Sequence, residues 1–159
     1  MFKITDDITY IGVNDHETDL FEGQYIIPDG ISYNSYLITD EKIAIMDSVD
    51  KVKYDEFEKN LDEALNGRTP DYLVVHHVEP DHASSIGMLM EKFPHMQIVA
   101  SAGALKVLPL YFGLDLSNAI TIKEGDELCL GKHTLSFVAA PMVHWPEVMM
   151  SYDATDKVL

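Results

Sequence analysis

Short apolar runs alternate with polar, turn-rich segments along the chain, and most runs have the period of a strand or of a helix. Residues 30–49 predict two strands around a turn at 39–42, because they are rich in β-branched residues and tyrosine. Phe57, Leu61 and Leu65 recur at helical spacing and predict a helix over 54–67, which Gly67 ends. Further strands are expected at 8–15, 71–77, 96–101 and within 118–142, further helices at 81–94 and at 101–113 with a break or kink at Pro109, and a hairpin turn at 153–156.

Strands and helices alternate through the middle of the chain, and hairpins lie on both sides, so the pattern predicts an α/β fold with a mixed sheet. The 159 residues suffice for one domain with a core. Val158 and Leu159 follow the last turn and are expected to begin a strand without its ladder partners, which predicts an incomplete C-terminus. The exposed sheet edge that results favours a homo-oligomer or a complementing chain.

The chain is strongly acidic, with a formal net charge of −16. Such a surface repels nucleic acid and anionic membranes, and it favours cations or basic partners unless it is merely solvated. The single cysteine, Cys129, excludes an internal disulfide and a thiolate metal site, so a reducing, cytoplasmic location is expected. No 18-residue apolar run and no signal peptide are found, so no membrane span is expected.

Candidate chemistry is concentrated in the stretch "YLVVHHVEPDHASSIGMLMEKF", residues 72–93. His77, Glu79, Asp81 and His82 follow an apolar strand and precede a helix, where an irregular loop can turn them toward one point at the carboxyl end of the strand. Two neighbouring carboxylates repel each other unless a cation lies between them. The spacing therefore favours a divalent metal site.

His144 stands in the same context, since it follows an apolar strand and Pro141, and it can complete a set of three ligands. The alternatives are a hydrogen-bonded or exposed histidine pair, Asp81 as a helix N-cap, and His144 as an ordinary loop residue. The donors are nitrogen and oxygen without sulfur, and Glu79 makes the set harder and more negative, which suits iron or manganese better than zinc, although affinity order alone would still admit zinc. The remaining histidines are not nominated: His76 is expected to face the other way, and His16, His95 and His133 are expected on the surface.

The segments "HHVEPDHASSIGML", "APMVHWPEVMMSYD" and "GVNDHETDLFEG" through "KIAIMDSVD" resemble the flavodiiron proteins, or A-type flavoproteins, along the whole chain. Glu79 separates this pattern from the hydrolases of the metallo-β-lactamase superfamily, which have a histidine there. The resemblance implies a metallo-β-lactamase-like αββα sandwich with a mixed sheet. It also implies reduction of oxygen to water, or of nitric oxide to nitrous oxide, at a non-haem diiron centre.

The resemblance assigns His77, Glu79 and His144 to one iron and Asp81 to the second, while His82 matches a position that need not coordinate. Tyr25 and Trp145 match residues near the diiron pocket, where packing is an equal explanation. In the family, electrons come from FMN in a following flavodoxin-like domain. A rubredoxin-like or flavodoxin-like protein supplies electrons to that FMN.

The chain departs from the family pattern, because the later bridging aspartate, the last histidine and an FMN phosphate loop are absent. Residues 1–159 are therefore expected to be the N-terminal portion of the diiron domain, with an incomplete second iron site and no FMN domain. We expect such a chain to be inactive alone. The alternatives are a zinc-dependent hydrolase that uses a metal-bound hydroxide, and a non-catalytic metal-binding fragment that needs a partner chain.

Overall fold

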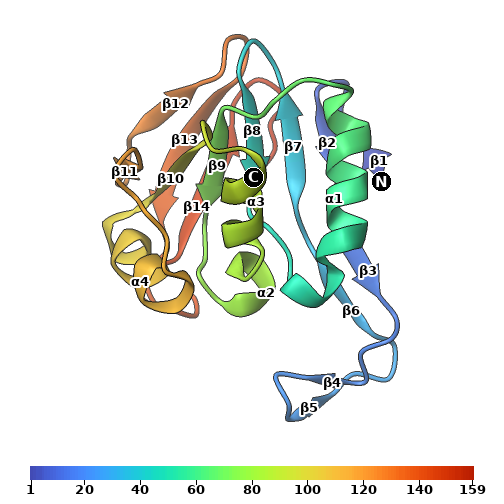
Figure 1. The fold of residues 1–159 in the computed structure, drawn as a ribbon. Coiled ribbons are helices and arrows are strands. Elements are labelled where there is room, and N and C mark those ends of the chain that lie inside the picture. Colours follow the sequence, from blue (N-terminus) through green and yellow to red (C-terminus); the bar gives the residue numbers. More distant parts are fainter.

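A seven-stranded mixed sheet forms the centre of the computed structural model, which describes residues 1–159 (Figure 1). Its order is β1-β2-β7-β8-β9-β10-β11, antiparallel from β1 to β8 and parallel from β8 to β11. Helices connect the parallel strands, as parallel pairing requires. The strands are β1 (Phe2–Lys3), β2 (Ile8–Tyr10), β7 (Tyr36–Thr39), β8 (Ile43–Met46), β9 (Tyr72–Val75), β10 (Gln97–Ser101) and β11 (Ile120–Ile122).

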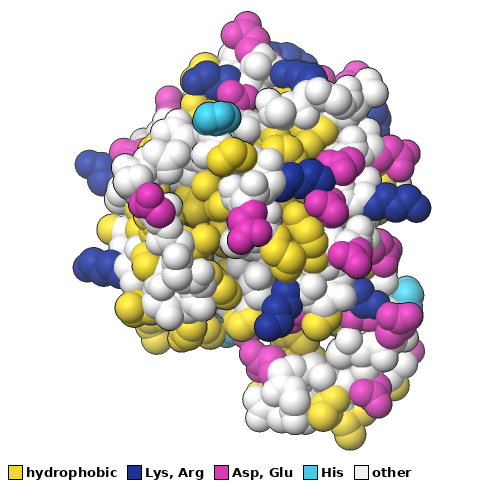
Figure 2. Space-filling model, viewed as in Figure 1, with side chains coloured by type: hydrophobic (Ala, Val, Ile, Leu, Met, Phe, Trp, Pro, Cys, Tyr) yellow, Lys and Arg dark blue, Asp and Glu magenta, His cyan; other side chains and the backbone are white.

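Three smaller antiparallel sheets contain the other strands. The strands β12, β13 and β14 form one sheet, and β3 pairs with β6. The hairpin of β4 and β5 projects from the body of the molecule, and Figure 2 shows it as a separate lobe. The bounds are β3 (Val13–Asp15), β4 (Leu20–Phe21), β5 (Tyr25–Ile26), β6 (Ile31–Tyr33), β12 (Glu127–Cys129), β13 (Thr134–Ala139) and β14 (Met149–Asp153).

The helices lie on one face of the large sheet (Figure 1). In α1, apolar residues at helical spacing are buried against the sheet, and the helix ends at Asn66, which adopts the left-handed conformation. None of the helices combines the length and hydrophobicity needed to cross a bilayer. The helices are the 3₁₀ turn η1 (Lys51–Lys53), α1 (Tyr54–Leu65), α2 (Pro80–Ala83), α3 (Ile86–Lys92) and α4 (Ala102–Phe112).

Two buried clusters define three layers. One cluster lies between the helices and the large sheet and includes Phe57, Leu61 and Leu73. The other lies between the opposite face of that sheet and β12–β14, and it includes Val74 and Phe137. The neighbouring residues Leu73 and Val74 point to different clusters, as expected for a strand covered on both faces. The predicted α/β fold with a mixed sheet is confirmed, and the chain provides one helical layer and two sheets.

Two predicted helices differ from the observed ones. The helix expected over 81–94 is divided into α2 and α3, because Ser84 and Ser85 separate the two segments. Of the break or kink expected at Pro109, the break is not seen, since α4 runs through this residue to Phe112 and ends at Gly113, whose φ is 63°. A proline inside a helix removes one backbone hydrogen bond and crowds the preceding turn, and α4 accommodates both without ending there.

His133 is completely buried, so its predicted surface position is wrong. Its Nδ1 lies 3.0 Å from Asp153 Oδ2 and its Nε2 lies 3.1 Å from Asp7 Oδ2. Two carboxylates compensate the cost of burying the imidazole, and these partners are far away in the sequence. The contacts join the β1–β2 turn of the large sheet to the end of β14 in the small sheet.

Ser101 links the end of β10 to the start of α4, and its replacement gives a first test of the fold. Ser101 Oγ accepts the Ala104 N–H at 3.1 Å and thereby caps α4. We expect Ser101→Ala to lower the free energy of unfolding by about 1 to 2 kcal/mol in urea denaturation, because the N-cap is lost together with the hydrogen bond that Ser101 Oγ donates to the Glu147 carbonyl. The exposed Ser117→Ala is the control and should change it by less than about 0.5 kcal/mol. Equal effects of both substitutions would contradict the capping role.

Candidate metal centre

The site lies where two loops meet at the carboxyl end of β9. The first loop leaves β9 after Val75, and Pro80 begins α2, so the residues between them are irregular. The second loop joins β13 to β14 and carries His144. The Met149 N–H donates to the His76 carbonyl at 3.0 Å, which fixes the start of β14 against the first loop. Residues 67 positions apart in the sequence are thus brought together.

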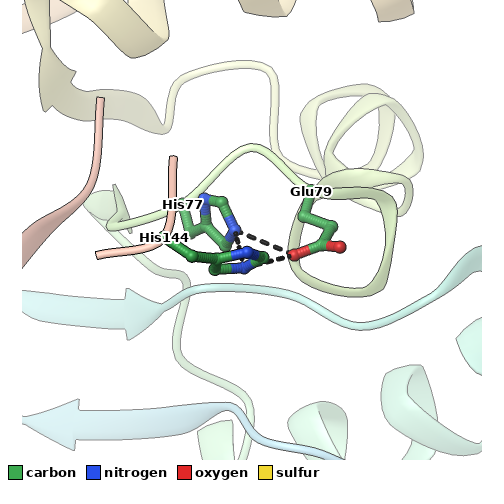
Figure 3. A group of neighbouring side chains, drawn as sticks. All are labelled: His77, Glu79 and His144. Carbon is green, nitrogen blue, oxygen red and sulfur yellow. Dashed lines mark hydrogen bonds and ion pairs between the residues drawn. The ribbon is translucent and has the colours of Figure 1, made fainter. Parts of the chain in front are cut away.

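His77, Glu79 and His144 point toward one another, as Figure 3 shows. Glu79 Oε2 lies 2.9 Å from His77 Nε2 and 2.9 Å from His144 Nε2. The two Nε2 atoms are 3.2 Å apart. Separations of this size let one ion lie about 2.1 Å from all three atoms, which is the usual distance for imidazole and carboxylate ligands. His77 and Glu79 are buried, whereas the His144 side chain is 68% exposed.

The donor set requires a positive charge. Glu147 accepts a hydrogen bond from His77 Nδ1 at 2.8 Å, which leaves a lone pair on His77 Nε2 directed at the Glu79 carboxylate. Burial favours a neutral Glu79, but the hydrogen bond from Glu22 and the neighbouring histidines outweigh it and lower the pKa of Glu79. An anionic oxygen and imidazole lone pairs converge on one point, so the residues present fit a metal cation.

Asp81 and His82 lie beside these three residues but outside the group that shares one point. The His82 ring centroid is 5.3 Å from that of His77. Asp81 Oδ1 and His82 Nδ1 are buried and have no hydrogen-bond partner. Burial raises the pKa of Asp81. Buried polar atoms without partners are costly, so Asp81 and His82 provide free ligand atoms for a second cation. Asp81 is not the N-cap of α2, because Glu79 holds that position.

The two predicted pocket residues, Trp145 and Tyr25, lie in different places in the structure. Trp145 is half-buried, and its ring meets that of His77 edge-on, with centroids 5.1 Å apart. Tyr25 is 57% exposed on the projecting hairpin and does not line the cavity beside Glu79, so the structure does not bring it to the site. The turn of its two-stranded hairpin presents Glu22 instead. Met149 and Met150 line a second cavity, between the two sheets, which also reaches His82.

A cavity of about 400 Å³ opens on the Glu79 and Asp81 side of the site. Phe21 and Glu22 of the projecting hairpin form part of its lining. A hydrogen bond to Glu79 raises the pKa of Glu22. The lining residues are Thr18, Leu20, Phe21, Glu22, Tyr33, Asp50, Val52, Glu79, Pro80 and Asp81.

Sequence reasoning missed Glu22 and Glu147. Glu147 stands three residues after His144 in "HWPEVMM", and a carboxylate so close to a ligand histidine is the signal that could have found it. No sequence signal marks Glu22, because a separate hairpin brings it to Glu79. His76 faces away from the site, as predicted, and bonds Asp47 at 2.9 Å and Ser151 at 2.8 Å.

Comparison with known proteins identifies the family. The sequence model of the ODP family beta lactamases matches residues 31–159. The chain belongs to this family. Over 158 residues it is 36% identical to the anaerobic nitric oxide reductase flavorubredoxin of Vibrio vulnificus, with 98% of the chain and 32% of the relative covered. The family match and the mixed sheet agree with the expected metallo-β-lactamase-like fold.

Two solved structures show this similarity. The flavodiiron protein of Giardia intestinalis superposes with a TM-score of 0.91 at 28% identity, covering 98% of this chain and 38% of that one. The rubredoxin oxygen:oxidoreductase of Desulfovibrio gigas gives a TM-score of 0.90 at 32% identity, covering 96% of this chain and 38% of that one. The chain therefore spans about a third of the length of its curated relatives.

Proposed function

We propose that the chain forms part of a flavodiiron oxidoreductase that reduces oxygen to water, nitric oxide to nitrous oxide, or both. The observation that carries this proposal is the convergence of His77, Glu79 and His144 within 4.8 Å of one another, with a glutamate in the middle position. Similarity to an anaerobic nitric oxide reductase and to a rubredoxin oxygen:oxidoreductase supports it.

In this proposal, His77, Glu79 and His144 hold one iron, and Asp81, with His82 beside it, faces a second. Bound iron supplies electrons and open coordination positions for a diatomic ligand. Glu79 contributes negative charge, and the Trp145 ring packs edge-on against the His77 ring. The cavity beside Glu79 gives a small substrate a route to the site.

The same proposal assigns residues 1–159 to the N-terminal portion of a metallo-β-lactamase-like diiron domain and places FMN in a separate flavodoxin-like domain. A rubredoxin-like or flavodoxin-like protein is the proposed electron donor. The single cysteine supports a reducing, cytoplasmic location. We further propose that the chain associates with itself or with a complementing chain.

Anaerobic titration of the chain with ferrous iron, followed by elemental analysis, tests the proposal. We expect one tightly held iron per chain at the group formed by His77, Glu79 and His144, two of which are buried, and a weaker second iron. Oxygen and nitric oxide consumption by the isolated chain should stay at background. Failure to bind iron would refute the proposal. Tight zinc binding with hydrolytic activity would instead support a zinc-dependent hydrolase.

A further inference from the structure

The side chain of Glu147 is buried directly behind His77, on the side away from Glu79 and His144. Glu147 Oε1 lies 2.8 Å from His77 Nδ1 and 3.2 Å from the Val78 nitrogen, and both groups donate to it. Only 5% of its side chain is exposed. One carboxylate oxygen thus bonds the ring of a candidate ligand and the backbone of the loop that carries it.

The surrounding structure fixes the position of Glu147. Ser101 Oγ donates to the Glu147 carbonyl at 3.0 Å. Gly103 allows a close approach, because a Cβ at this position would lie only 2.9 Å from Glu147 Cβ. The end of β10 and the first turn of α4 therefore hold the backbone of Glu147, and through it the ring of His77.

The hydrogen bond from His77 determines which ring nitrogen carries the proton. A carboxylate can only accept, so contact with Glu147 places the proton of a neutral imidazole on Nδ1. Nε2 then keeps its lone pair for a cation. Without Glu147, a proton on Nε2 can instead be donated to Glu79, which lies 2.9 Å away, and this closes the site to a cation.

We propose that Glu147 is a positioning residue, which holds the His77 imidazole as its Nδ1–H tautomer so that Nε2 can bind the metal. This inference rests on the proposed function only in the identity of the metal. A merely structural role, in which Glu147 anchors the Val78 backbone, makes no prediction about the tautomer of His77.

Replacing Glu147 by methionine keeps a side chain of similar length and removes the oxygen that accepts the His77 proton. We expect Glu147→Met to weaken ferrous iron binding about 10- to 100-fold in anaerobic titrations, the usual effect of losing such a partner. Nitrogen-15 NMR of the metal-free chain should show His77 shifting from the Nδ1–H toward the Nε2–H tautomer. Glu147→Asp, which restores the carboxylate, should recover part of the iron affinity and part of the Nδ1–H tautomer population. Glu127→Gln, on an exposed carboxylate, is the control and should change neither.

The outcomes separate the two roles. A drop in affinity with an unchanged tautomer means that Glu147 only anchors the loop, and it overturns the proposal. So does an unchanged affinity, or an equal loss in the Glu127→Gln control. Because the NMR measurement needs no metal, a wild-type chain that binds no iron would refute the proposed function while the tautomer of His77 could still be tested.

Discussion

His144→Ala is expected to remove tight iron binding while leaving the fold intact. His144 supplies one of the three converging donor atoms, and its loss leaves only His77 and Glu79. The drop in ferrous iron affinity should exceed the roughly 10- to 100-fold typical of residues that support a ligand from behind. The His144 side chain is 68% exposed, so the metal-free variant should unfold at the same urea concentration as the wild type, within error.

His95→Ala is the matched control, because His95 is an exposed histidine away from the site. Anaerobic titration with ferrous iron should give the wild-type affinity for this variant. The metal site would be refuted if His144→Ala bound iron as tightly as His95→Ala. Loss of binding together with a lower urea midpoint would show that His144 also supports the fold, contrary to its exposure.

The candidate site could be predicted largely from local sequence. An apolar strand followed by His77, Glu79 and Asp81 places polar groups at a strand end, and the same pattern before His144 suggests a second strand end nearby. Both predictions depend on short-range rules that link apolar runs to strands and prolines to loops. The ring centroids of His77 and His144 lie 5.0 Å apart, so the two strand ends do meet.

Groups that depend on long-range packing could not be predicted. Glu22 reaches Glu79 from a projecting hairpin, and Tyr25 of the same hairpin stays exposed. Their positions follow from how that hairpin packs beside Glu79, and no periodicity encodes this. The predicted surface position of His133 is wrong for the same reason, because its partners Asp7 and Asp153 lie on other strands and turns.

His133 is also expected to make the stability of the fold depend on pH. Burial favours the neutral imidazole, but the hydrogen bonds with Asp7 and Asp153 outweigh it and raise the pKa of His133. Asp40 accepts the His133 backbone N–H, Asp156 lies nearby, and Lys132 pairs with Asp7. A raised pKa in the folded state means that this stabilisation is complete below the unfolded value of about 6.5 and is lost as the pH rises through the folded value.

His133→Gln should therefore cost about 3 kcal/mol near pH 6, the lower end of the range for breaking a buried ion pair, and clearly less near pH 9. Urea denaturation of both proteins at several pH values measures this difference. His76 also has a raised pKa, because burial lowers it but the Asp47 carboxylate outweighs burial. His76 is present in both proteins, so the comparison with the wild type removes its contribution. The exposed His16→Gln is the control and should cost less than about 0.5 kcal/mol at every pH. A cost for His133→Gln that stays constant from about pH 6 to 9 would mean that His133 joins the two sheets as a neutral hydrogen-bonding group, with no charge involved.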